Sequence, residues 1–172
     1  RTQSVKIKTD FMKEVFKKYG DEFVIEGNNQ IRKSGRFSDL VWTLSLAILY
    51  FHKDVKKVFD FIGERFGEIG DLKFYSDKVE KEFNYLVKRF YDEREAFDGG
   101  YYWEFESKFP LGSMLSNLIS AKEADKTFII LEKDDEYCRI NGRRQDKKIN
   151  MADFMKILVK DFSGASAGGH VP

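Results

Sequence analysis

The spacing of hydrophobic residues changes once along this 172-residue chain, near Asp98-Gly99-Gly100, and this change limits the possible folds more than any other feature. Before it, apolar residues recur every three to four positions, which is typical of helices with one buried face. After it, residues 101–106 alternate with the period of two that a β-strand requires. We therefore expect a mainly helical region over residues 1–98 and a small separate domain over residues 99–172.

The first region has four segments with helical spacing and one short segment rich in β-formers. Ser38 or Asp39 is a candidate N-cap of the most apolar of the helices. This helix should be buried, because it is apolar on nearly all sides. We expect a strand at residues 23–25, and helices at 11–19, 38–51, 54–66 and 76–97.

The second region predicts an α+β domain with a mixed sheet and one helical layer. Asn150 is a candidate N-cap, because its side-chain oxygen can accept a hydrogen bond from the first turn of a helix. The expected order is a strand at 101–106, a helix at 112–119, strands at 127–132 and 136–143, a helix at 151–158 and a glycine-rich loop at 163–170.

The composition excludes some kinds of binding partner but does not identify the binding site. Lys and Arg total 30 and Asp and Glu total 29, so no overall positive field attracts nucleic acid or a membrane, and any anion site must be local. Cys138 is the only cysteine, which excludes an internal disulfide framework and favours a reduced, cytoplasmic setting; we expect it to be a packing residue. The longest apolar run, 44–51, is too short to span a bilayer, so we expect no membrane partner.

The loop that ends in Gly168-Gly169-His170 is a candidate anion site. Glycines allow a backbone to approach a ligand closely, and successive N–H groups form a nest of partial positive charge. A histidine beside them can donate to a phosphate oxygen. On spacing alone, a flexible exit from the preceding helix is an equally good interpretation.

A basic segment precedes this loop, with five Lys and Arg residues and only Asp146 to offset them between residues 139 and 148. Strand alternation places Arg139, Asn141 and Arg143 on one face, and guanidinium groups bind phosphate through two hydrogen bonds. The alternative is an edge hairpin that its charges protect from aggregation. The remaining basic residues of the segment are Arg144, Lys147 and Lys148.

Together, the strand with Asn141-Gly142-Arg143-Arg144, the helix after it and the loop Ala167-Gly168-Gly169-His170 resemble the DHH-associated C-terminal domain of DHH phosphoesterases. The resemblance is greatest to archaeal RecJ-type single-strand nucleases and covers residues 101–172. In that family a Ser-x-Arg element ends the strand and a Gly-Gly-Gly-His loop completes the substrate cradle. Here Asn141 stands at the Ser position and Ala167 at the first Gly, and the domain is expected to be truncated at its C-terminus.

The resemblance implies phosphodiester hydrolysis by two metal ions, Mn or Mg, held by an Asp-His-His set in an N-terminal domain. This sequence has no such run: its histidines are His52, expected at a helix end or on the surface, and His170. We therefore expect no catalytic residue, metal ligand or cofactor in this chain. The expected substrate-binding residues are Asn141, Arg143, Arg144, Gly168, Gly169 and His170.

Three functions remain open at this point. The chain could bind single-stranded DNA or RNA for an exonuclease whose metal site lies outside it. It could be part of a replication-fork scaffold that binds a GINS-type complex through helices in 54–98, which would require an exposed apolar patch. It could also serve an oligonucleotide or cyclic-dinucleotide phosphodiesterase, for which a narrow pocket closed by the glycine loop would be typical.

Overall fold

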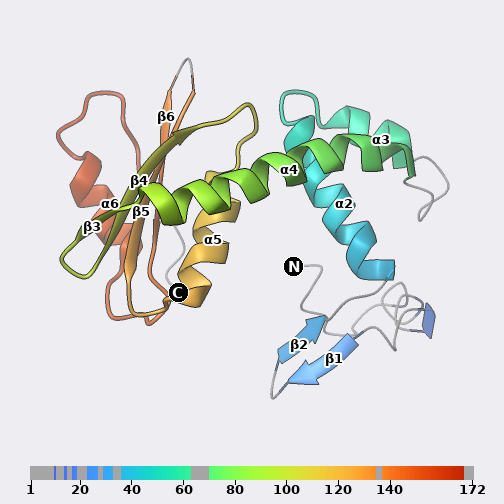
Figure 1. Ribbon diagram of the computed structural model, residues 1–172, viewed down its shortest axis with the longest axis horizontal. Helices are drawn as coiled ribbons and strands as arrows, with labels where there is room; N and C mark the ends of the chain where they lie inside the picture. The colour runs from blue at the N-terminus through green and yellow to red at the C-terminus, as the bar shows by residue number, and fades with distance from the viewer. Residues whose placement is uncertain are drawn as a thin grey trace. The chain divides into compact units, whose positions relative to one another are not determined.

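The structure is a computed structural model, and the residues it describes are 10, 14, 17–18, 23–26, 29–32, 36–62, 70–134 and 137–168 (Figure 1). The predicted helix at 11–19 lies largely outside these residues, and Gly169 and His170 lie outside them entirely. The chain divides into two compact units, residues 1–79 and 80–172.

The first unit contains a small hairpin and helices that share an apolar core. The strands β1 (Phe23–Glu26) and β2 (Asn29–Arg32) pair antiparallel. The helices are α2 (Arg36–Tyr50), α3 (Lys56–Ile62) and the first part of α4 (Gly70–Glu93). The core consists of Leu40, Ala47, Val58 and Leu72, against which Leu44, Phe51, Ile62 and Tyr75 pack.

Several predicted boundaries in this unit differ from the structure. The strand predicted at 23–25 is confirmed, but its partner β2 was not predicted. Helix α2 begins at Arg36, so Ser38 and Asp39 lie in its first turn and do not cap it. The helix expected at 54–66 is described only as α3, because residues 63–69 lie outside the described part.

The second unit is built on a four-stranded sheet in the order β3-β4-β5-β6. Its strands are β3 (Glu95–Phe97), β4 (Gly100–Glu106), β5 (Thr127–Lys133) and β6 (Cys138–Arg143). β4 and β5 are parallel and the other pairs are antiparallel, which confirms a mixed sheet in an α+β fold. Helix α5 (Gly112–Lys122) supplies the crossover that a parallel pair needs.

Helices cover both faces of this sheet, where one helical layer was expected (Figure 1). On one face, the ring of Phe90 from α4 packs against Trp103 and Phe128 at centroid distances of 5.7 and 6.1 Å. On the other face, helix α6 (Met151–Val159) packs against β6. Gly142 permits this contact, because a Cβ there would lie 2.8 Å from Met151 Cε and from Met155 Sδ.

The units meet between residues 79 and 80, whereas the predicted boundary was at 98/99. The helix expected at 76–97 runs from Gly70 to Glu93, and residues 95–97 form strand β3. Gly99, with φ +81°, makes the turn from β3 into β4. The second half of α4 therefore belongs to the sheet domain, because Phe90 is part of its core.

Candidate functional site

A cleft of about 640 Å³ lies between strand β6, helix α6 and the loop 164–168. Its lining brings the basic strand and the described part of the glycine loop to one place, as the sequence predicts. The described residues that line it include no Asp or Glu. They are Cys138, Ile140, Asn141, Gly142, Arg143, Arg144, Gln145, Met151, Ala152, Met155, Val159, Gly164, Ala165, Ser166, Ala167 and Gly168.

Local sequence explains how α6 and the loop reach this position. The Asn150 side chain accepts hydrogen bonds from the N–H groups of Ala152 (3.1 Å) and Asp153 (3.4 Å), so the predicted N-cap is confirmed. After the helix, the Ala165 N–H donates to the Phe162 carbonyl. Gly164 then adopts φ +78°, a left-handed conformation that suits glycine, and the chain continues along the cleft.

Arg143 combines the features expected of an anion-binding residue. It pairs with Phe128 of β5, so the predicted alternation of the basic strand is confirmed. No described strand pairs with the other edge of β6, and both faces of the strand border the cleft at this edge. Arg143 is half-buried and has no ion pair or hydrogen bond from its side chain to any described residue. Its guanidinium is therefore available to a ligand.

Asn141 stands two residues earlier on the same strand and also lines the cleft. Its side-chain amide is close to the start of α5, since a Cβ on Gly112 would lie 2.5 Å from Asn141 Nδ2. No hydrogen bond joins this amide to the described residues. Both members of the predicted Asn-x-Arg element thus border the cleft, and no described residue uses their side-chain hydrogen-bonding groups.

Arg144 differs from its neighbour, although the sequence placed both among the ligand residues. Its Nε and Nη2 donate to the two carboxylate oxygens of Asp146 at 2.7 and 2.9 Å, and Nη1 donates to Thr127 Oγ1 at 3.2 Å. This pairing lowers the pKa of Asp146 to about 2. Arg144 lines the cleft, but its guanidinium is committed to the turn after β6, so we leave it out of the proposed ligand set.

Arg139 is also committed within the protein. It lies 3.8 Å from the carboxylate of Glu132 and donates a hydrogen bond to the Tyr137 hydroxyl. Glu132, only 3% exposed, accepts the N–H of Leu111 at 2.7 Å and the N–H of Gly112 at the start of α5. Burial raises the pKa of Glu132, and the two N–H groups and Arg139 oppose this rise. This buried acid was not predicted, although a lone Glu on the apolar face of a strand could have indicated it.

The floor of the cleft is apolar. Met151 and Met155 each keep 8% of their surface exposed, while Ile140 on β6 is 37% exposed. None of the three was predicted as a site residue, and the spacing of the two methionines indicates only a buried helix face. Cys138, expected to be a packing residue, is exposed and borders the cleft instead.

The aromatic residues at the start of β4 pack in the protein core or interact with charged side chains at the surface. Trp103 is 3% exposed and stacks on Phe105 at 4.9 Å. The Arg94 guanidinium lies 3.8 Å from the centre of the Tyr101 ring. The Tyr102 hydroxyl donates to Glu104. Burial, and to a smaller extent this hydrogen bond, raises the pKa of Tyr102 to about 12. Tyr101, Tyr102 and Trp103 do not line the cleft.

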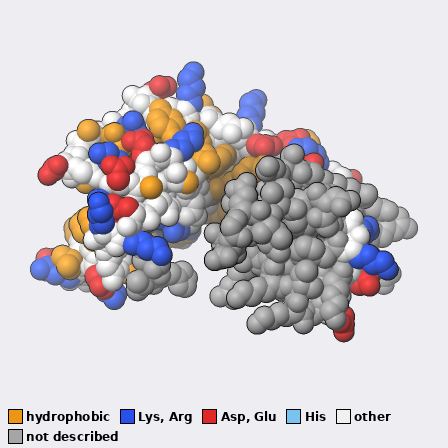
Figure 2. All heavy atoms as spheres, turned by 90° about the horizontal axis from the view of Figure 1, so that it is seen from below, with side chains coloured by type: hydrophobic (Ala, Val, Ile, Leu, Met, Phe, Trp, Pro, Cys, Tyr) orange, Lys and Arg blue, Asp and Glu red, His pale blue; other side chains and the backbone are white. Residues whose placement is uncertain are grey.

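Metal-binding groups are absent from the described residues, where no three His, Cys, Asp or Glu side chains come together. His52 Nδ1 lies 3.0 Å from the Leu49 carbonyl oxygen at the end of α2, as expected for a helix-end residue. The surface in Figure 2 shows basic and acidic side chains interspersed, in agreement with the balanced composition. Within the described part of the chain, no helix has both the length and the apolar character needed to cross a membrane.

Comparison of the sequence with models of known protein families, and with curated proteins, finds no match. The function is therefore inferred from the cleft and its residues.

Proposed function

We propose that the second unit binds single-stranded DNA or RNA through the cleft beside β6, as the substrate-binding part of a DHH-type phosphodiesterase or exonuclease. One observation carries the proposal: Arg143, whose side chain has no partner among the described residues, lines the same cleft as Gly168, the described end of the predicted anion loop. A cleft with a basic residue, and with no acidic residue among its described lining, suits a phosphodiester backbone.

The division of labour follows from the residues present. Arg143 can hold a phosphate through two parallel hydrogen bonds, and the amide of Asn141 can donate beside it. Gly169 and His170 follow Gly168 directly in the sequence, and we propose that they complete the anion site. In this proposal, Mn or Mg acts from a catalytic domain outside this chain, and the cleft contributes the position of the substrate.

The direct test compares Arg143→Ala with Lys148→Ala, two variants that lose the same charge. Lys148 has a 76% exposed side chain and does not line the cleft. We expect Arg143→Ala to weaken binding of a fluorescent single strand by about 1–3 kcal/mol, as loss of a hydrogen bond to a charged group does. Lys148→Ala should chiefly reduce the salt dependence.

Fluorescence anisotropy at two salt concentrations measures both effects. Equal and small losses in the two variants would mean that the basic strand is only a charged sheet edge. Circular dichroism of each variant checks that the fold is retained.

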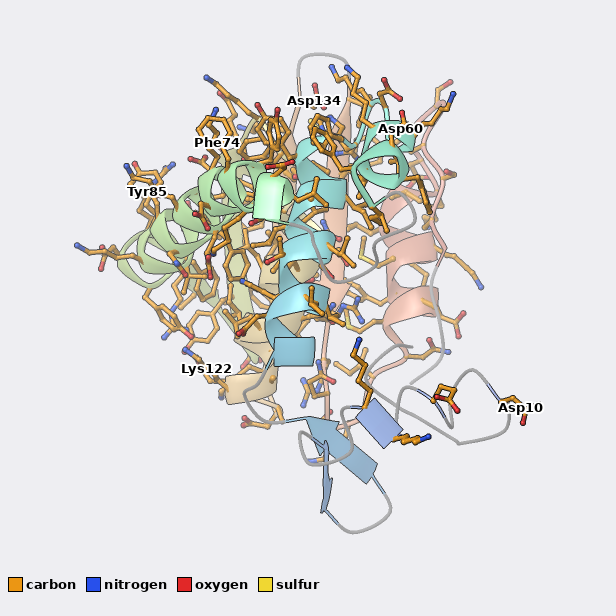
Figure 3. All side chains as sticks on the ribbon, turned by 90° about the vertical axis from the view of Figure 1, so that its right-hand side faces the viewer. Asp10, Asp60, Phe74, Tyr85, Lys122 and Asp134 are labelled. Carbon is orange, nitrogen blue, oxygen red and sulfur yellow. The ribbon has the colours of Figure 1, made fainter. Side chains whose placement is uncertain are left out.

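A second candidate function is docking of a GINS-type replication partner, and exposed aromatic residues favour it. Phe59 on α3 and Phe74 on α4 are 67% and 62% exposed, and Figure 3 shows the Phe74 side chain directed away from its helix. Phe74→Ser should then abolish binding to a purified GINS-type complex without changing single-strand affinity. Unchanged partner binding in this variant would count against docking at α4.

A further inference from the structure

We infer that the cleft binds one nucleotide of the strand as a unit, with the base against the floor formed by Ile140, Met151 and Met155 and the phosphate at Arg143. This inference rests on the proposed function and deepens it. It implies that the site recognises the base of one nucleotide together with its phosphate. A long stretch of sugar-phosphate backbone is not bound by this cleft.

The cleft combines a cationic part and an apolar part. Its one free cation among the described residues is Arg143, and the other lining arginine, Arg144, is held by Asp146. Arg143 lies on the face of β6 that pairs with Phe128, and the cleft extends around the strand edge to α6, which contributes Met151, Ala152, Met155 and Val159 and no charge. A ligand that satisfies both parts has an anionic group joined to a flat apolar surface, which describes a nucleotide.

The methionine side chains of the floor suit an aromatic ring. Thioether sulfurs are polarisable and make favourable contacts with aromatic rings, and the flexible methionine side chain adapts to rings of different size. Such a surface accepts every base, because each presents the same kind of face. The cleft volume of about 640 Å³ is also in the range of small-ligand pockets.

Helix α6 lies close to strand β6. A side chain at Gly142 would meet Met151 and Met155, so glycine lets both methionines lie against the strand. Charge favours a nucleotide over an extended peptide added to the β6 edge, because the described lining offers a free cation and no acidic group.

The test uses the whole chain, labelled with ¹³C at the methionine methyl groups, and two ligands of equal charge. One is a 5′-phosphorylated trinucleotide of deoxyadenosine, and the other is its abasic analogue. We expect the trinucleotide to bind about tenfold or more tightly than the analogue, as stacking of a base on a protein surface implies. Its ring currents should shift the Met151 and Met155 methyl signals and leave Met114, which does not line the cleft, unchanged.

A pair of variants separates the floor from general surface effects. Ile140 and Ile149 are 37% and 38% exposed, but only Ile140 lines the cleft. Ile140→Ser should lower the affinity for the trinucleotide severalfold and leave the abasic analogue unaffected, whereas Ile149→Ser should change neither.

Each result decides between the claims. The inference would be overturned if the two ligands bound with equal affinity and the methionine methyl signals did not shift. If Arg143→Ala still weakened binding in that case, the proposed function would stand. Absence of binding by both ligands would overturn both. Methyl shifts produced equally well by an acidic peptide of the same charge would assign the floor to a peptide and contradict the inference.

Discussion

Glu132 places a carboxylate inside the interface between the sheet and α5, where its two backbone N–H partners at Leu111 and Gly112 would otherwise be unsatisfied. Burial raises the pKa of Glu132 from its ordinary value of 4.5. Between the unfolded and folded pKa values, the folded protein therefore binds more protons than the unfolded chain. The free energy of unfolding falls as the pH rises through this window.

This sign can be measured with Glu132→Gln, which keeps an acceptor oxygen and removes the titration. The stability of the wild type relative to the variant should decrease as the pH is raised from below 4.5 toward neutrality. Glu104→Gln gives the opposite slope, because Lys133 and Tyr102 lower the pKa of Glu104. Urea unfolding at several pH values measures both; parallel slopes in the two variants would contradict the assignment of Glu132 as a buried, destabilised carboxylate.

The different roles of Arg143 and Arg144 could not be predicted from the sequence. Arg143 and Arg144 are adjacent and chemically identical, so the sequence placed both on the ligand. The turn after β6 returns Asp146 to Arg144 and leaves Arg143 without a described partner. Lys147, with φ +61°, lies in this turn, and such a left-handed position of a Lys was not predicted from the pattern.

Among the elements, α6 is the one on which the cleft most depends. Asn150 caps it, and one wall of the cleft comes from Met151, Met155 and Val159. We expect Asn150→Ala to lower the free energy of unfolding by about 1 kcal/mol, the usual cost of a lost N-cap. Single-strand affinity should fall as well, because the first turn of α6 borders the cleft.

Asn150→Ser is the matched control, because a Ser at this position also accepts from the first-turn N–H groups and adds no charge beside Asp153, to which the Asn150 amide donates. It should retain both stability and binding, as measured by urea unfolding and fluorescence anisotropy. A loss of binding in Asn150→Ala without a loss of stability would mean that Asn150 contacts the ligand directly, contrary to this account.

At the level of elements, period and capping residues predicted β4, α5, β5 and the N-cap of α6 well, since these depend on local pattern. Strand β3 was missed because Glu95-Ala96-Phe97 continues a helical spacing and forms a strand only by pairing with β4. The face on which α6 packs was missed for a similar reason. It depends on the space left by Gly142, which a one-dimensional pattern does not contain.

For the molecule as a whole, the prediction about activity comes from the sequence, which has no Asp-His-His run of the kind that the resemblance implies for the metal site. We predict that the purified 172-residue chain binds single strands but releases no nucleotides with Mn or Mg. Labelled oligonucleotides on a sequencing gel provide the measurement. Metal-dependent cleavage that persists through repurification and disappears in Arg143→Ala would contradict the proposed division between binding and catalysis.

The central claim is that the ligand binds beside β6, and an amide chemical-shift map of the whole chain with a short 5′-phosphorylated oligonucleotide tests it most directly. The account predicts that the largest changes occur at residues 138–145, 151–159 and 164–168. It also predicts that the imidazole of His170 titrates at higher pH in the complex, because a bound anion favours its protonated form. Changes confined to α3 and the start of α4, with the cleft unaffected, would contradict it.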